Sequence, residues 1–315
     1  MGTNIDCQKM KKQKENSRAG QFVEAVNKFG KLFSTKTYSP WLHSDFIWSL
    51  TSYGRESARC VKIMHKFTRS LIKKRKQEIL NKGIEVSQKR LALLDLLLKL
   101  HLEDPTAITE EQIREEVDTF VFAAHDTTGI AINTSLFEIG HHPDVQDQLH
   151  EEIDAIFGDD KTRPTTSDDL KQLPYLDMVL KESMRIYPSA PVVSRHLNED
   201  LQMGDFVLPK GTDVVMSIAA LHRDKNVFPD PEKFDPLRFS ADEQAKRDPF
   251  AFLPFSAGPR SCIGQKFAQL KEKIIVTNIL RRYQIETLGR RGDFQQDLGI
   301  ALDLVTPINI KFTER

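Results

Sequence analysis

One long helical pattern in the middle of the chain limits the folds that are open to it. Thr109-Glu110-Glu111-Gln112 has the form of a capping box, in which the first and last side chains satisfy backbone N–H groups at a helix start. From there the helical pattern runs with few breaks to about Gly140. At 1.5 Å per residue such a helix is roughly 45 Å long, so it crosses a whole domain.

Shorter elements are expected around this helix. Pro143 and Pro174 suit first helical turns, because the N–H that proline lacks would have no partner there. The predicted elements are helices at 143–158, 174–187 and about 263–283, and strands at 201–207 and 213–218 around the turn Leu208-Pro209-Lys210-Gly211.

A second helical pattern, from Gln21 to about Glu78, is interrupted by an aromatic stretch at 33–53. This stretch holds both tryptophans of the chain, Trp41 and Trp48. One interpretation is core packing of a helix–loop–helix; the other is a lip that faces a membrane surface or a substrate.

No internal repeat and no low-complexity linker divides the 315 residues. We therefore predict a single domain over 1–315, mainly α with small β-sheets. The 45 Lys and Arg balance the 45 Asp and Glu, so no overall field favours nucleic acid, and none is expected as a partner. No apolar window is long enough for a membrane span, and no secretory signal is evident. The sparse, odd set of three cysteines predicts an intracellular, or at least cytosol-facing, protein.

The three cysteines, Cys7, Cys60 and Cys262, are too far apart for a disulfide framework or a zinc ribbon. A lone cysteine is usually a small buried hydrophobe, but the surroundings of Cys262 favour a ligand role. It lies at the predicted start of the last helix, where free N–H groups and the helix dipole favour an anion. Gly258 permits a sharp turn.

Two neighbours of Cys262 point to a particular ligand. Gly264 lets a flat, bulky group lie against the backbone, and the guanidinium of Arg260 suits a carboxylate. A thiolate, a seat shaped by glycine and an arginine for a propionate together describe a haem site.

The segment Phe255-Ser256-Ala257-Gly258-Pro259-Arg260-Ser261-Cys262-Ile263-Gly264 resembles the haem signature FxxGxRxCxG of the cytochrome P450 monooxygenases. Three further motifs of this family occur in the expected order along the chain. Ala123-Ala124-His125-Asp126-Thr127-Thr128 resembles (A/G)GxDT(T/S), Glu182-Ser183-Met184-Arg185 resembles ExxR, and Phe234-Asp235-Pro236-Leu237-Arg238-Phe239 resembles FxPERF. The chain is identified as a member of that family on these motifs.

The resemblance implies a haem b cofactor with Cys262 as axial ligand to the iron. It implies that Arg260 and Arg195 hold the haem propionates, and that Phe255 shields the sulfur. For Arg195 the alternative is a strand-edge arginine in a salt bridge. Electrons would come from NADPH through a separate reductase, because the chain has no nucleotide motif.

Two more sets of residues take roles from the resemblance. Glu182, Arg185 and Arg238 would form a buried structural cluster; the alternative is a surface pair of Glu182 and Arg185 at i, i+3. Asp126 and Thr127 would hold a water and deliver protons, the alternative being a solvent-facing acid beside a threonine bonded to its own helix. Leu237 departs from the family pattern, which has Glu there.

The runs 118–128, 176–185 and 253–260 resemble the family 4 branch, the fatty-acid ω-hydroxylases. This implies oxygen insertion into a C–H bond of a lipid or fatty-acid-like substrate. It also implies the cytosolic face of the endoplasmic reticulum membrane, with contact through 33–53. The anchor, first sheet and early helices of the family have no counterpart here, so a soluble or peripheral state is also open. We expect Met1 to belong to a truncated isoform or an incomplete gene model.

Two substitutions within the oxygen motif matter. Ala123 stands where many members of the branch have the glutamate that esterifies a haem methyl, so we predict haem held without that covalent link. Ala124 replaces the usual glycine and narrows the groove for oxygen. The rival to the enzyme is a truncated, non-catalytic relative that binds haem weakly or acts only through partners. A zinc hydrolase fails on ligand spacing.

Overall fold

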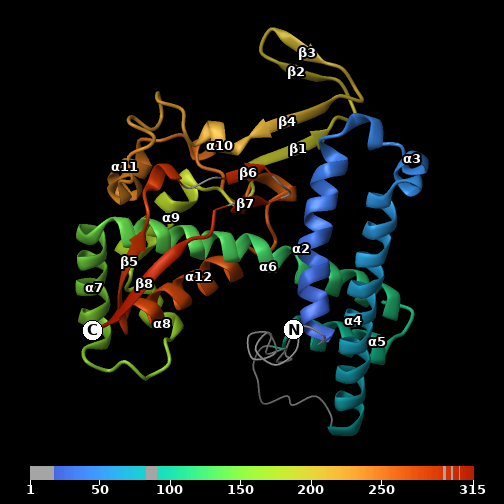
Figure 1. The fold of residues 1–315 in the computed structure, drawn as a ribbon, viewed down its shortest axis with the longest axis horizontal. Helices are drawn as coiled ribbons and strands as arrows, with labels where there is room; N and C mark the ends of the chain where they lie inside the picture. The colour runs from blue at the N-terminus through green and yellow to red at the C-terminus, as the bar shows by residue number, and fades with distance from the viewer. Residues whose placement is uncertain (1–17, 83–90, 294–295, 299–300, 305) are drawn as a thin grey trace. The chain divides into compact units, whose positions relative to one another are not determined.

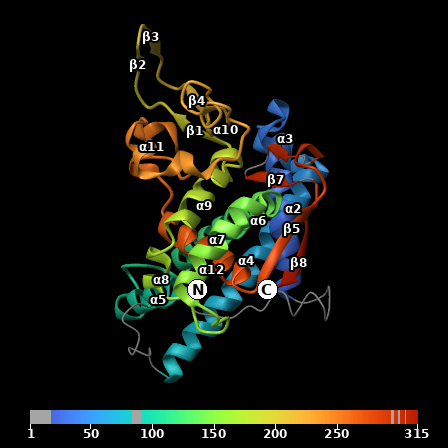
Figure 2. The ribbon, with the colours of Figure 1, turned by 90° about the vertical axis from the view of Figure 1, so that its left-hand side faces the viewer.

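The computed structural model describes residues 18–82, 91–293, 296–298, 301–304 and 306–315. The chain divides into two compact units, Met1–Ala123 and Ala124–Arg315. Within the described residues, long helices dominate and the sheets are small and antiparallel (Figures 1 and 2), which confirms the predicted fold class. Cys7 lies outside the described residues.

Two long helices that pack along each other form much of the first unit (Figure 1). Phe22 of one stacks on Phe67 of the other, with ring centroids 4.4 Å apart, and Cys60 is buried between them near Ala25. The elements of this unit are α2 (Arg18–Thr37), η1 (Pro40–Leu42), α3 (Asp45–Leu50), α4 (Ser52–Lys82), α5 (Leu93–Glu103) and the first part of α6 (Glu110–His141).

Core packing accounts for part of the aromatic stretch at 33–53. Leu42 is buried, and Trp48 stacks on Tyr53 with centroids 6.4 Å apart, as expected for a packed helix–loop–helix. Trp41 and Phe46, however, are 70% and 73% exposed. The turn between α2 and α4 therefore presents two large aromatic rings to its surroundings.

The predicted long helix is confirmed as α6. Thr109 N–H donates to Gln112 Oε1 at 2.8 Å, and Gln112 N–H donates to Thr109 Oγ1 at 3.3 Å, so the capping box forms as expected. Ile113 and Val117 in its first turns are fully buried against apolar residues of α4 and α5.

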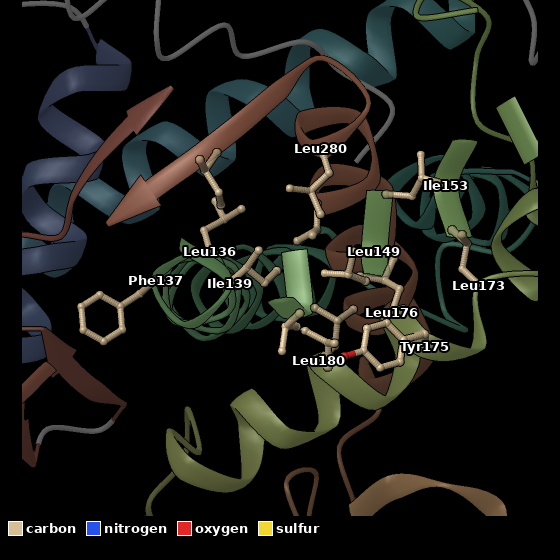
Figure 3. Packing of buried hydrophobic residues seen from close by; sticks show 14 of the residues in the cluster. Leu136, Phe137, Ile139, Leu149, Ile153, Leu173, Tyr175, Leu176, Leu180 and Leu280 are labelled. Atoms are coloured by element: carbon tan, nitrogen blue, oxygen red, sulfur yellow. The ribbon is translucent and has the colours of Figure 1, made fainter. Parts of the chain in front are cut away.

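The second unit is built on the remainder of α6 and three further helices, whose apolar faces meet in one core (Figure 3). Leu149, Leu176 and Leu280, from three different helices, are fully buried there. Each buried side chain of this size contributes about 1.5–3 kcal/mol. These three helices are α7 (Pro143–Phe157), α9 (Pro174–Ile186) and α12 (Gln265–Leu280), and the shorter helices of the unit are α8 (Ser167–Lys171), α10 (Ile218–Leu221) and α11 (Ala241–Ala245).

Prolines mark helix starts as predicted: Pro143 and Pro174 are the first residues of α7 and α9. The unit also contains short 3-10 helices, η2 (Pro236–Phe239), η3 (Pro249–Ala251), η4 (Gly258–Arg260) and η5 (Arg291–Asp293).

Antiparallel pairs of strands complete the second unit. The described pairs are β1 (Val192–His196) with β4 (Asp213–Ser217), β2 (Leu201–Met203) with β3 (Phe206–Leu208), β5 (Tyr283–Leu288) with β8 (Asn309–Glu314), and β6 (Gln296–Leu298) with β7 (Leu302–Leu304). The prediction of one strand over 201–207 is wrong. Gly204 at φ +58° turns the chain there and makes a β2–β3 hairpin.

The last helix is shorter than the predicted 263–283. It begins at Gln265 after Gly264, and Tyr283 already belongs to β5. A tertiary contact explains the early end, because the side-chain amide of Gln146 clamps the backbone of Ile285: Ile285 N–H donates to Oε1 at 2.7 Å, and Nε2 donates to the Ile285 carbonyl at 2.8 Å.

Candidate functional site

The Cys262 segment, residues 255–264, closes on itself through backbone contacts. Cys262 N–H donates to the Phe255 carbonyl at 2.9 Å, and Ser261 N–H donates to the Gly258 carbonyl at 3.0 Å. Ser256 and Gly258 both have positive φ, +60° and +76°, which is what turns the chain so tightly. The loop therefore has its own hydrogen-bonded shape before it enters α12.

The position of Cys262 differs slightly from the prediction. Gly264 caps α12, so the thiol lies two residues before the cap and outside the helix. A Cβ placed on Gly264 would lie 3.8 Å from Cys262 Sγ, an ordinary contact distance. The glycine thus keeps the space beside the sulfur open.

The surroundings of the thiol fit a flat, apolar, anionic cofactor with a metal centre. Cys262 is a free, exposed cysteine, and two large apolar neighbours, Ile263 and Phe267, are 86% and 64% exposed. A flat apolar group bound beside the thiol would cover this exposed surface. Arg260 is exposed and makes no ion pair among the described residues, so its guanidinium is available for a carboxylate.

Arg195 is brought to this segment from β1. Its Nη2 donates to Ser256 Oγ at 3.2 Å, and its Nη1 donates to the Ser194 carbonyl at 2.8 Å. Phe255 is half-buried and lines a pocket of about 190 Å³ together with Met184 of α9. A strand, a helix and the cysteine loop therefore meet around the residues that precede Cys262.

Glu182 and Arg185 of α9 form a bidentate pair with no exposed side-chain surface. Arg185 Nε and Nη2 donate to the two Glu182 oxygens at 2.7 and 2.9 Å. Asp235 N–H donates to Glu182 Oε1 at 2.9 Å, and Arg238 Nε lies 3.5 Å from that oxygen. Burial raises the pKa of Glu182, an effect that Arg185 opposes.

The remaining donors of the two arginines reach backbone carbonyls. Arg185 Nη1 donates to the His222 carbonyl at 3.0 Å, Arg185 Nη2 to that of Lys233 at 3.2 Å, and Arg238 Nη2 to that of Asp230 at 3.0 Å. The cluster of Glu182, Arg185 and Arg238 therefore ties α9 to the irregular chain that leads toward the Cys262 segment.

The oxygen motif lies on α6. Asp126 Oδ1 is 2.6 Å from His125 Nδ1, and this hydrogen bond raises the pKa of His125. The Thr127 carbonyl accepts a hydrogen bond from Ser189 Oγ at 2.9 Å, which fixes the helix to the chain after α9. Among the described residues, no hydrogen bond or ion pair joins Asp126 to the Cys262 segment.

Sequence reasoning missed several buried titratable residues of the second unit, among them His222 and Glu272. His222 is fully buried and accepts a hydrogen bond from Leu253 N–H at its Nε2, at 2.9 Å. Glu272 of α12 is also buried, with Ser135 Oγ donating to it at 3.1 Å, and burial raises its pKa to about 7. The only signal in the sequence was the helical spacing of Glu272 from buried Val276.

Comparisons with known proteins agree with these features. The family model described as Cytochrome P450 matches residues 2–310. The chain is 40% identical to Cytochrome P450 4c3 of Drosophila melanogaster, with 96% of this chain and 59% of the relative covered. It is 41% identical to Cytochrome P450 4V2 of Mus musculus (97% and 58% covered) and 36% identical to Cytochrome P450 4c21 of Blattella germanica (98% and 62%).

The chain thus spans about 60% of the length of these curated relatives. The match nevertheless includes the Cys262 segment, the α9 cluster and the oxygen motif, all within residues 2–310. The chain belongs to the cytochrome P450 family.

Proposed function

We propose that this chain is the haem-binding part of a monooxygenase that inserts one oxygen atom from O2 into a C–H bond of a lipid or fatty-acid-like substrate. The observation that carries the proposal is the exposed Cys262 thiol, set in a closed loop that also holds the exposed Arg260. The haem, when bound, supplies the oxygen-activating redox chemistry. Thiolate ligation favours that chemistry.

Each residue of the site would contact a different part of the haem. Cys262 Sγ would hold the iron, while Arg260 and Arg195 would pair with the propionates. Phe255 would shield the sulfur. Its side chain is half-buried, and its carbonyl accepts a hydrogen bond from the Cys262 N–H. Gly264 would leave room for the ring beside the sulfur.

Asp126 and Thr127 would hold a water and move protons at their side-chain oxygens. His125 supports this role, because its Nδ1 lies 2.6 Å from Asp126 Oδ1. This hydrogen bond raises the pKa of His125, so a second group that can carry a proton lies beside the Asp126 carboxylate. The cluster of Glu182, Arg185 and Arg238 would act structurally, because it contacts backbone and not the thiol.

The partners follow from the same family reading. An NADPH-dependent reductase would supply the electrons, and the cytosolic face of the endoplasmic reticulum would be the location. Trp41 and Phe46, exposed on the turn between α2 and α4, offer rings for a membrane surface. No helix within the described residues is long and apolar enough to cross a bilayer.

Spectroscopy tests the proposal directly. The chain is loaded with haem, reduced and treated with carbon monoxide, and the thiolate-specific absorption band is expected. Turnover of a fatty acid with NADPH and a reductase then tests the substrate class. A featureless spectrum from folded protein would refute the proposal and favour the non-catalytic relative.

A further inference from the structure

His222 is buried at a junction between α9 and the Cys262 segment. It follows α10 directly and has no exposed surface. None of the roles proposed above involves it. Its ring lies against that of Phe252, with centroids 4.9 Å apart.

The backbone and the ring of His222 make hydrogen bonds to two different segments, α9 and the chain just before the Cys262 segment. Its backbone carbonyl accepts from Arg185 Nη1 at 3.0 Å, and its ring Nε2 accepts from Leu253 N–H at 2.9 Å. Leu253 lies two residues before Phe255, whose carbonyl accepts the N–H of Cys262 at 2.9 Å. A short chain of contacts therefore runs from Arg185 through His222 to Cys262.

The contact with Leu253 fixes the protonation of the ring. A backbone N–H is a donor, so Nε2 must be the unprotonated nitrogen and the proton sits on Nδ1. The backbone carbonyls of Arg185 and Met184 interact with the buried ring from α9.

The charges around the ring favour its neutral form. Burial lowers the pKa of His222 to about 4, and the guanidiniums of Arg185 and Arg223 add to this effect. The backbone carbonyls of Arg185 and Met184 act in the opposite direction. Glu182 is already paired with Arg185. Near pH 7 the ring is therefore a neutral acceptor for Leu253.

We propose that His222 is a positioning residue: its ring holds the backbone of Leu253 and thereby sets where the Cys262 segment stands relative to α9. The inference rests on the proposed role of Cys262 as the haem ligand. The link itself, however, consists only of contacts within the chain, and it can be measured without haem.

Three substitutions of His222 separate the effect of its hydrogen-bond acceptor from the effect of its side-chain volume. His222→Gln places an amide oxygen near the position of Nε2, so it keeps an acceptor for Leu253 N–H. His222→Asn places its amide near Nδ1, too short to reach, and His222→Leu removes the acceptor while keeping an apolar side chain. The Gln and Asn variants are matched in polarity, so a difference between them reports the contact.

Amide hydrogen exchange of the haem-free, full chain is the first measurement. We expect exchange at Leu253 to be about fivefold to tenfold faster in the Asn and Leu variants than in the parent, and close to the parent in Gln. After haem loading, Asn and Leu should show a smaller fraction of the thiolate band than Gln at equal haem content.

Equal protection of Leu253 in all four proteins would overturn the proposal, as would an equal loss of the thiolate band in Gln and Asn. If the parent takes up no haem, the proposed function fails. The exchange of Leu253 still decides whether His222 holds the segment.

Discussion

The pair Glu182–Arg185 and the Cys262 segment lie in the same unit, yet they are built in opposite ways. Both side chains of the pair have no exposed surface, and every oxygen of Glu182 has a donor. Cys262, Ile263 and Arg260 are exposed, and the segment is held mainly by backbone hydrogen bonds. The polar groups of one region are paired within the chain, whereas the other region leaves apolar and charged groups exposed.

We expect this difference to separate residues that hold the fold from residues that bind the proposed cofactor. Removing one member of a buried ion pair leaves an uncompensated charge, so the damage spreads to the fold. Removing an exposed thiol leaves no cavity and no orphaned charge, so only binding should change. The predictions below test this separation, beginning with the largest effect.

Cys262→Ser should abolish the thiolate band completely while the chain remains folded, because the thiol is exposed and contributes no buried contact. Reduced, carbon-monoxide-treated spectra and a thermal melt measure the two effects separately. Cys60→Ser is the matched control: Cys60 is buried, so the variant should lose stability and keep the band. Equal loss of the band in both variants would contradict the assignment.

Glu182→Ala and Arg185→Ala should each lower the free energy of unfolding by about 3–5 kcal/mol and lower haem retention with it. Denaturant unfolding of each variant provides the measurement. The control is Glu243→Ala, since Glu243 pairs with Lys246 at the same i, i+3 spacing but on the surface, and no measurable change is expected there. Stable, haem-loaded α9 variants would show that burial of the pair matters less than its geometry suggests.

The sequence predicted several helix starts and the cysteine motif because their signals are local. Pro143 and Pro174 open helices, and the capping box at Thr109 opens the long one, as expected from residues a few positions apart. The motif at 255–264 was readable for the same reason: its glycines, arginine and cysteine stand at fixed spacing in one segment.

Features that depend on residues far apart in the sequence could not be predicted from local patterns. The early end of α12 follows from the clamp of Gln146 on Ile285, 139 residues apart, which no local pattern reveals. The burial of His222 and Glu272 likewise depends on tertiary packing. Gly204 was a local signal that was overlooked within the expected strand at 201–207.

Glu272 sharpens the comparison, because it is a buried carboxyl group without a guanidinium partner. Its pKa is raised from 4.5 to about 7, chiefly by burial, so the folded chain holds a proton that the unfolded chain releases. Its contribution to stability is full below about pH 4.5 and is lost as the pH rises through 7.

Glu272→Gln removes this titration while its amide oxygen still accepts from Ser135. Relative to the parent, the variant should gain about 3 kcal/mol of unfolding free energy between pH 4.5 and pH 8. Urea unfolding of both proteins across that range measures the difference. A difference that stays constant with pH would show that Glu272 titrates normally.

The smallest expected effect concerns the attachment of the haem. In the resembling branch, the carboxylate that forms the ester stands three residues before the aspartate of the oxygen motif, and here that residue is Ala123. Asp126 is nearly a full turn onward and is assigned to proton transfer. Asp118 lies five residues back, roughly 140° around the helix at about 100° per residue, so neither acid substitutes easily.

We therefore expect Cys262 to supply the only bond between the chain and the haem. Denaturing extraction followed by chromatography should release all of the haem from the parent. Ala123→Glu should retain part of it on the polypeptide after turnover, with the thiolate band unchanged, because the substitution alters attachment and not ligation. Haem that stays with the parent chain would mean that the cofactor-facing region is anchored by a carboxylate as well as by the thiol, and that the alignment at Ala123 is wrong.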